Sequence, residues 1–188
     1  GTITRRALTV DTVAAQSKTY DGSVSADAGK FSATLGNTIA GDSVTATAAD
    51  AAYNSKDVAA ANAVNYTGVA LGGSDAGNYT LAATTAQGTG TITKRALTLG
   101  AVESQSKTYD GTRAADAARF SAGLNNIVTG DSVTATAAGA AYNDKNVARA
   151  NAVGYTGVAL AGAGAGNYTI ADTAQGTGTI TKRALTLG

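Results

Sequence analysis

Residues 90–100 read Gly-Thr-Ile-Thr-Lys-Arg-Ala-Leu-Thr-Leu-Gly, and residues 178–188 repeat them letter for letter. The rest of the chain repeats as well, since Lys18-Thr-Tyr-Asp-Gly22 returns as Lys107-Thr-Tyr-Asp-Gly111 at a shift of 89 positions. A period of about 90 residues is too long for one rung of a solenoid and fits small complete domains in series. The repeat therefore predicts two domains, residues 1–94 and 95–182, followed by the start of a third repeat at 183–188.

Within residues 90–100, the apolar side chains do not all point to the same side of an extended chain. In an extended chain Ile92 and Leu97 point to opposite sides, because their positions differ by an odd number. One strand cannot bury both in the same core. We therefore expect the segment before Lys94 to close the first domain, Lys94 and Arg95 to lie solvated at the joint, and the segment after them to open the second domain. Without a Gly or Pro spacer, the joint is expected to be tight.

Short alternating runs dominate the pattern along each copy. Residues 43–48, 64–67 and 78–81 alternate small apolar or aromatic residues with polar ones, and Gly, Asn and Asp separate the runs. Only the Ala-rich stretch 23–30 favours a short helix or an irregular loop over a strand. This pattern predicts an all-β protein of two tandem immunoglobulin-like β-sandwich domains in an elongated end-to-end array.

Composition predicts a thin core. Leu, Ile, Val and Phe together number 31 of the 188 residues, a low share for a globular chain. Disorder needs a high net charge as well, and here 14 basic residues nearly balance 13 acidic ones. We therefore expect folded domains of modest stability, whose cores are completed by Ala and by the eight Tyr.

The residues that are missing exclude several classes of function. Without Cys and His, the sequence offers no disulfide, no thiol nucleophile and no imidazole base or metal ligand. A single Glu among scattered Asp gives no acid–base pair, so we expect no enzyme, no catalytic residue and no cofactor. The basic residues are scattered and the net charge is +1, which argues against nucleic acid. No apolar run predicts membrane insertion in this segment.

Tyr20-Asp21-Gly22 and Tyr109-Asp110-Gly111 are the most conspicuous motif of each copy. An aromatic ring beside a carboxylate can hold a sugar or a cation. Asp-Gly is also a strong turn signal, because Gly adopts positive φ freely and Asp tolerates it. We interpret the motif as a structural turn with a packed Tyr, and we interpret Gly41-Asp42 and Gly130-Asp131 as turns in the same way.

Tyr79 and Tyr168 follow a Gly-Asn pair in each copy. Their context resembles the corner of immunoglobulin-like sandwiches, where a Tyr hydroxyl bonds to upstream backbone. Asp75 in the first copy is replaced by Gly164 in the second, so the aromatic residue is kept and the acid is not. That difference favours a structural corner over a set of metal ligands.

Two further chemistries remain open for the polar turns. Calcium is the metal that their oxygen atoms suit, but Asp21, Asp27 and Asp42, the acids with Asp counterparts in the second copy, are far apart in sequence, so we expect no metal site. Lys18 and Lys107 are candidates for covalent Lys–Asn or Lys–Asp crosslinks. Nothing in their spacing demands such a bond.

Taken together, the motifs at 18–22, 41–44, 53–59, 76–81 and 92–98 resemble the YDG-type repeat. This repeat is a companion of the MBG-type repeat in very large secreted bacterial adhesins of the filamentous haemagglutinin type. The resemblance covers nearly the whole chain, although Ile-Thr-Lys-Arg stands where such repeats often have Ile-Thr-Pro-Lys. It implies export, tandem repetition, and attachment at a bacterial cell surface or in a matrix, and it supplies no catalytic residue.

The first functional hypothesis is a structural one, in which tandem domains, with neighbouring repeats of the same chain as partners, form an extracellular stalk that projects a distal binding region. The second makes each repeat a weak binding module for polysaccharide or a host protein, contributing to adhesion or to biofilm matrix attachment by avidity. Self-association through edge strands and ice binding through the many Thr are the remaining alternatives.

Overall fold

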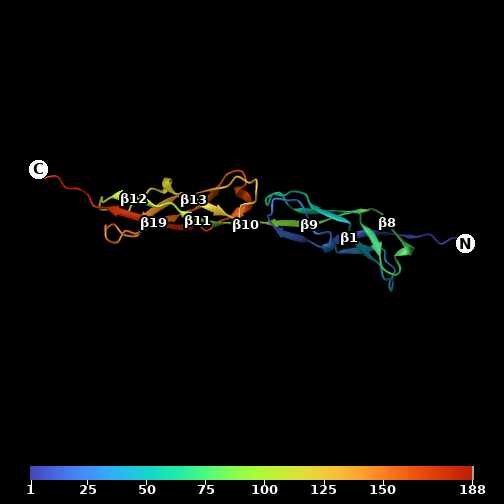
Figure 1. Cartoon of the computed structure of the whole chain (residues 1–188). Helices are drawn as coiled ribbons and strands as arrows, with labels where there is room; N and C mark the ends of the chain where they lie inside the picture. The colour runs from blue at the N-terminus through green and yellow to red at the C-terminus, as the bar shows by residue number, and fades with distance from the viewer. Residues whose placement is uncertain (188) are drawn as a thin grey trace. The chain divides into compact units, whose positions relative to one another are not determined.

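The chain forms two compact units, Gly1–Lys94 and Arg95–Gly188, in a computed structural model that describes residues 1–187. Both units are built from strands and short 3₁₀ turns, which makes the protein all-β (Figure 1).

The first unit contains one sheet of four strands, one of three and one of two. Their orders are β2-β9-β6-β5, β3-β1-β8 and β4-β7. The strands are β1 (Arg6–Val13), β2 (Gln16–Thr19), β3 (Ala33–Gly36), β4 (Thr45–Thr47), β5 (Asp50–Tyr53), β6 (Ala63–Thr67), β7 (Ala70–Gly72), β8 (Tyr79–Leu81) and β9 (Thr85–Thr93), with 3₁₀ turns η1 (Ala28–Lys30) and η2 (Ala76–Asn78).

The second unit repeats this arrangement with one strand divided. Its sheets have the orders β12-β19-β16-β15, β11-β13, β10-β18 and β14-β17, and β10 with β11 stands where β1 does in the first unit. The elements are β10 (Arg95–Ala96), β11 (Thr98–Val102), β12 (Gln105–Thr108), η3 (Ala117–Arg119), β13 (Ala122–Asn125), β14 (Thr134–Thr136), β15 (Gly139–Tyr142), β16 (Ala152–Thr156), β17 (Ala159–Ala161), η4 (Ala165–Asn167), β18 (Tyr168–Thr169) and β19 (Thr173–Thr181).

Parallel pairing joins the beginning and the end of each unit. In the first unit β1 pairs with β8 and β2 pairs with β9, both in parallel. In the second unit β10 pairs with β18 and β12 pairs with β19 in the same sense. The other pairings, such as β6 with β9, are antiparallel. The first strands of each unit are therefore held directly by its last strands.

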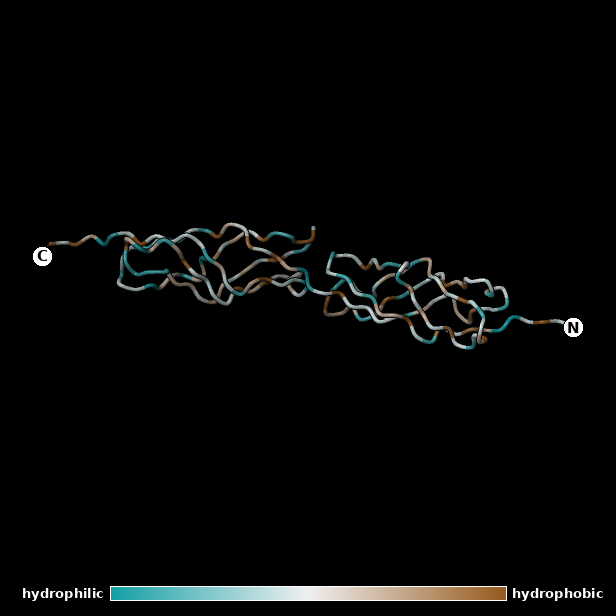
Figure 2. Tube along the Cα trace, turned by 90° about the horizontal axis from the view of Figure 1, so that it is seen from below, coloured by the Kyte–Doolittle hydropathy of each residue, from teal (hydrophilic) through white to brown (hydrophobic). Residues whose placement is uncertain are grey.

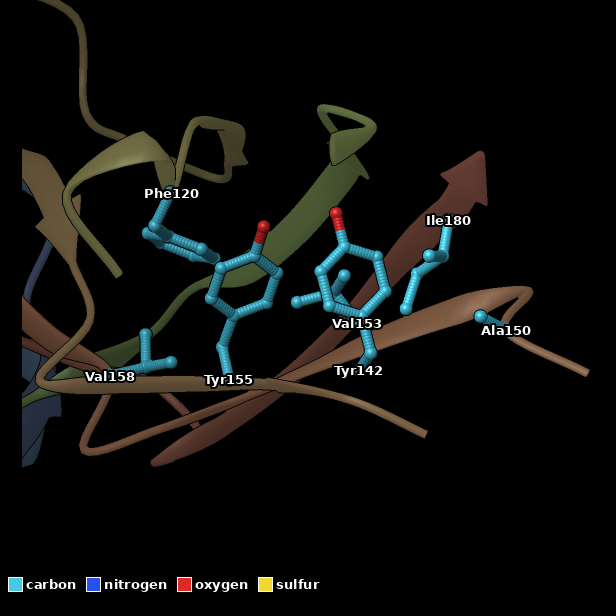
Figure 3. Packing of buried hydrophobic residues seen from close by; sticks show 7 residues of the cluster. All are labelled: Phe120, Tyr142, Ala150, Val153, Tyr155, Val158 and Ile180. Atoms are coloured by element: carbon cyan, nitrogen blue, oxygen red, sulfur yellow. The ribbon is translucent and has the colours of Figure 1, made fainter. Parts of the chain in front are cut away.

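The core of each unit is small and rich in Tyr. In the second unit one cluster of buried residues holds the sheets together, and Figure 3 shows it with Tyr142 and Tyr155 side by side. The ring of Tyr155 meets Phe120 at a centroid distance of 4.9 Å. Along the chain, apolar and polar stretches alternate at short intervals instead of forming long apolar blocks (Figure 2). The cluster consists of Phe120, Tyr142, Ala150, Val153, Tyr155, Val158 and Ile180.

The joint segment differs from the expectation at one residue. Ile92 is buried in the first unit and Leu97 in the second, and Lys94 is exposed. Arg95 was expected to be solvated, but it is half-buried, and its Nε donates to the Asn126 carbonyl oxygen at 2.8 Å. The Asn126 carbonyl oxygen lies in the turn after the strand β13. It needs a hydrogen-bond donor, and the Arg95 guanidinium provides one.

The expected strands form, and β6 covers the whole run at 64–67, but the other two strands are shorter than their alternating runs. The run at 43–48 contributes only β4, and in the run at 78–81 Asn78 belongs to the turn η2. The stretch 23–30 contains an isolated bridge at Ser25 and the turn η1, so it is loop and short helix. Asp27 caps this turn by accepting a hydrogen bond from the Gly29 nitrogen at 2.9 Å. In the run at 78–81, the turn residue Asn78 delays the start of the strand.

Glycine on β9 lets two strands approach closely. A methyl group added at Gly90 would lie 2.7 Å from the carbonyl carbon of Ala63 on β6, which is backbone that cannot move aside. We therefore expect Gly90→Ala to destabilise the first unit by about 1–3 kcal/mol through overpacking. The measurement is hydrogen exchange or urea unfolding followed on residues of that unit.

Gly77→Ala is the control for this substitution. Nothing lies within 4 Å of the added methyl group, and Gly77 is not among the residues with positive φ. The free energy of unfolding should stay within about 0.5 kcal/mol or rise slightly. Equal losses in both variants would contradict the close approach at Gly90.

Candidate functional site

A lysine ammonium group anchors the Tyr-Asp-Gly turn of the first unit. The chain reverses at Gly22, whose φ of 80° requires a residue without a side chain or one that tolerates this region. The Nζ of Lys18 donates to Asp21 Oδ1 at 2.7 Å, to the Ser23 hydroxyl at 3.0 Å, and to the carbonyl oxygens of Ser23 and Ser25 at 2.8 and 3.0 Å. One cation thus ties the turn to the strand that precedes it.

The second unit builds the same anchor with different residues. The Nζ of Lys107 donates to Asp110 Oδ1 at 2.9 Å, to the hydroxyl and carbonyl oxygens of Thr112 at 3.0 Å, and to the carbonyl oxygen of Ala114 at 2.9 Å. Thr112 replaces Ser23 and keeps the hydroxyl, whereas Ala114 replaces Ser25, whose contribution is backbone only. The acceptor atoms are preserved although the side chains change.

The electrostatics of the anchor keep its aspartate charged. In the second unit, hydrogen bonds from Lys107 and from the Thr112 nitrogen and hydroxyl lower the pKa of Asp110 to about 2. In the first unit, partial burial raises the pKa of Asp21, but hydrogen bonds from Lys18 and Ser23 outweigh it and leave that pKa below its ordinary value. Each ammonium also lies over an aromatic ring, Lys18 at 5.4 Å from the Tyr53 centroid.

This geometry is an ion pair and does not favour the covalent crosslink considered for Lys18 and Lys107. Amide formation needs a neutral amine and a protonated carboxyl group, and the lowered pKa of Asp21 and Asp110 favours the opposite state. A bond between residues three apart would also crosslink only the turn itself. The anchor acts through hydrogen bonds and charge.

The two turn tyrosines differ in exposure. Tyr20 is fully buried, and the Lys56 ammonium lies 5.9 Å from its ring centroid. Tyr109 is half-buried and, with Leu185, lines an apolar hollow of about 480 Å³. A ring that stacks on a sugar must be accessible, so Tyr20 does not suit that role. Both Tyr residues belong to packed turns, with Gly111 at φ 80° in the second.

Tyr79 and Tyr168 form corners that cross about 40 residues of sequence. The Tyr79 hydroxyl accepts from the Ile39 nitrogen at 3.2 Å and donates to the Asp42 carboxylate. The Tyr168 hydroxyl accepts from the Val128 nitrogen at 2.9 Å and donates to Asp131 Oδ2 at 2.6 Å. The hydrogen bond to Asp42, together with burial, raises the pKa of Tyr79.

The partners of these corners were missed from the sequence. Gly41-Asp42 and Gly130-Asp131 were interpreted as turns alone, and both Gly residues do have positive φ. Their Asp side chains are also the acceptors for the corner Tyr. Asp75, which drew attention in the sequence, instead accepts from the Ser43 nitrogen at 2.8 Å, so its loss in the second copy leaves the corner intact.

A buried glutamine in each unit is a second residue that sequence analysis overlooked. The Nε2 of Gln16 donates to the Tyr66 hydroxyl at 2.9 Å and to the Asp27 carbonyl oxygen at 3.0 Å, while its Oε1 accepts from the Asp27 nitrogen at 2.9 Å. Gln105 makes the same three bonds, to Tyr155 and Asp116. The only signal was a Gln at the same place in both copies.

Within residues 1–187, no three His, Cys, Asp or Glu side chains gather in a way that would hold a metal ion. The Asp residues that are equivalent in the two copies each bind nearby backbone, a Lys or a Tyr. In the same part of the chain, no helix has the length and apolar character to cross a bilayer. The polar side chains described above hold turns in place.

These features define a class, an all-β tandem-repeat protein in which each repeat carries the same anchored turn and tyrosine corner. A family model described as the YDG domain matches residues 4–86 and matches again at residues 93–176. The chain therefore belongs to the YDG domain family and contains two copies in tandem, which confirms the resemblance to a YDG tandem repeat. No curated protein shows a significant match to the chain.

Removing the corner hydroxyl should destabilise the first unit. In Tyr79→Phe, the Ile39 nitrogen and the Asp42 carboxylate lose their partner, and we expect a loss of about 1–3 kcal/mol in the free energy of unfolding. The control is Tyr53→Phe, which removes a buried hydroxyl that has no hydrogen-bond partner among the described residues. Urea unfolding should show no loss for this control, and similar losses in both variants would contradict the corner.

Acid should weaken the second unit through Asp110. The pKa of Asp110 is about 2 in the folded state against an ordinary value of 3.8, so its contribution is complete above the ordinary value and is lost as the pH falls towards about 2. In Asp110→Asn this part of the pH dependence should disappear, as measured by urea unfolding between about pH 5 and 2.

Asp172→Asn is the control, because the Asp172 carboxylate contacts no donor among the residues described. It should keep the acid profile of the unmodified chain. An Asp110→Asn profile that matches the unmodified one would show that the ion pair adds nothing to stability.

Proposed function

We propose that the chain is a structural stalk segment of a bacterial cell-surface or secreted adhesin. In this proposal each YDG repeat is an immunoglobulin-like β-sandwich, the repeats follow one another end to end, and the array projects a distal binding region. The observation that carries the proposal is the parallel pairing of first and last strands within each unit. It matters because a stalk must resist extension from its two ends.

The parallel pairs place hydrogen bonds in shear when a repeat is pulled at its termini. β2 pairs with β9 from Gln16↔Gly90 to Thr19↔Thr93, over four consecutive residues. Force draws the first strands towards the N-terminus and the last strands towards the C-terminus. Because the two strands run in the same direction, they must slide past one another, and the ladder bonds bear the load together.

The second unit has the same loading geometry. β12 pairs with β19 from Gln105↔Gly178 to Thr108↔Thr181, again over four residues. The anchored turn lies directly after this ladder, where Lys107 binds Asp110 and the Tyr109 nitrogen donates to the Thr181 carbonyl oxygen at 2.8 Å. The turn therefore continues the connection between first and last strands beyond the ladder itself.

The family and the chemistry of the fold support two parts of this proposal, the tandem arrangement of the repeats and their folding outside the cell. Tandem repetition favours length, and the neighbouring repeats of the same chain would be the immediate partners. The anchors use ion pairs and hydrogen bonds, and the sequence has no Cys, so folding outside the cell needs no oxidation. The proposal also places the chain outside the cell.

Single-molecule stretching tests the mechanical role. Pulled from its two ends, the chain should give two unfolding events, each lengthening it by about 30 nm for a unit of roughly 90 residues. A second attachment, through Cys introduced at Thr47 and Ala70, pulls apart the end of the antiparallel pair β4–β7, so its bonds break one at a time. The chain contains no other Cys to interfere.

End-to-end pulling is expected to need clearly more force than pulling through Thr47 and Ala70. Equal forces in the two geometries, or a featureless extension from the ends, would overturn the stalk proposal. Small-angle scattering of longer arrays then tests the end-to-end arrangement, because a stalk should lengthen in proportion to the number of repeats.

A further inference from the structure

The second unit carries an open hollow of about 550 Å³ beside the strand that begins the lysine anchor. β12 contributes Ser106 and Lys107, β15 contributes Tyr142, and the turn η3 with its cap contributes Asp116 and Arg119. Three separate elements therefore bring polar groups to one place. The side of β12 that lines the hollow also belongs to the strand that pairs with β19.

The hydroxyl of a largely buried tyrosine opens on this hollow without a partner from the protein. Tyr142 is 2% exposed, and its hydroxyl forms no hydrogen bond with any residue that the structure describes. The neighbouring Tyr155 hydroxyl, which points in the same direction in Figure 3, accepts from Gln105 Nε2 at 2.7 Å. Unlike the enclosed Tyr53 hydroxyl, the Tyr142 hydroxyl is accessible from the hollow, so it is free to form a hydrogen bond with a ligand oxygen there.

One cation at the hollow has no counter-charge. Lys107 is paired with Asp110 and shares its remaining protons with Thr112 and Ala114. Arg119 is exposed, and its guanidinium forms no ion pair or hydrogen bond within residues 1–187. A free guanidinium presents two parallel N–H donors, which fit the two oxygens of a carboxylate.

Hydrogen-bonding groups of both kinds lie beside Arg119. Asp116 Oδ1 accepts from the Ala118 nitrogen at 2.9 Å, and its other oxygen has no donor among the described residues. Ser106 is exposed on β12 and offers a hydroxyl. A ligand that suits the hollow therefore carries one carboxylate together with several hydroxyl groups.

We propose that this hollow binds a uronate residue of an acidic polysaccharide, with the carboxylate on Arg119 and sugar hydroxyls on Asp116, Ser106 and Tyr142. The volume exceeds that of one sugar ring, and the hollow is open to solvent, so a sugar within a longer chain can reach it. An acidic peptide fits less well, because a sugar hydroxyl can donate to Asp116 and accept from Ser106 or Tyr142 at the same time, whereas a backbone N–H only donates and a carbonyl only accepts. This inference is independent of the stalk proposal.

The first unit supplies matched controls. Tyr53 is the counterpart of Tyr142, but its hydroxyl is completely enclosed and has no access to a ligand. Lys30 is the counterpart of Arg119, and a lysine ammonium lacks the planar pair of donors that a carboxylate prefers. Tyr53→Phe and Lys30→Gln therefore change the same kinds of group outside the hollow.

The test is an NMR titration of the ¹⁵N-labelled chain with three probes. These are tetragalacturonate, the same tetrasaccharide with its carboxylates reduced to alcohols, and tetraglutamate. We expect tetragalacturonate to shift the amide signals around Ser106, Asp116 and Arg119 with millimolar affinity, which weakens as salt is added. The neutral sugar and the peptide should bind at least about tenfold more weakly, because each lacks one of the two kinds of contact.

Substitutions then assign the contacts. Arg119→Gln should reduce the affinity for tetragalacturonate by about tenfold, and Tyr142→Phe by about threefold, while Tyr53→Phe and Lys30→Gln leave it unchanged. Both second-unit variants keep the fold, since Arg119 is exposed and the Tyr142 hydroxyl has no protein partner. Binding that survives both, equal binding of the neutral sugar or the peptide, or no shifts at the hollow would each overturn the proposal.

Discussion

Hydrogen bonds from buried tyrosine hydroxyls to residues far away in sequence organise both repeats, although the Tyr53 hydroxyl has no such partner among the described residues. The chain has few large aliphatic residues, so Tyr supplies most of the bulk at the centre of each unit. Every ring brings a hydroxyl with it, and an unpaired hydroxyl in the interior is costly. Gln16 therefore meets Tyr66, Asp42 meets Tyr79, and the loops that carry these partners are fixed by the core.

These hydrogen bonds link distant parts of the sequence. Gln16 lies on β2 and reaches Tyr66 on β6, fifty positions away, while also holding the backbone of Asp27. The lysine anchor then fixes the turn at the end of β2. A disulfide could link such distant segments with one bond. The chain has no Cys, so many hydrogen bonds link them instead. Each is weak, and they act together on the same strands.

Local patterns could be predicted from the sequence, and the partners across space could not. Alternation indicated the strand at 64–67, and Asp-Gly indicated the turn at Gly22, because both depend on a few neighbouring residues. The role of Asp42 depends on Tyr79 folding back over it, which no local pattern encodes. Arg95 was misjudged for the same reason, since its acceptor belongs to Asn126. The hollow at Tyr142 likewise exists only where β12, β15 and η3 meet.

Comparison of the two repeats separates the groups that hold the fold from those that are free to change. Lys18 and Lys107 keep the same set of acceptor atoms, although Ser23 becomes Thr112 and Ser25 becomes Ala114. Arg119 stands where the first repeat has Lys30, and its guanidinium contributes nothing to the anchor or the corner. A side chain without a structural contact can vary from repeat to repeat at little cost to stability. The two repeats thus share one hydrogen-bonded frame, while a surface group near Tyr142 in the second repeat differs from its counterpart in the first.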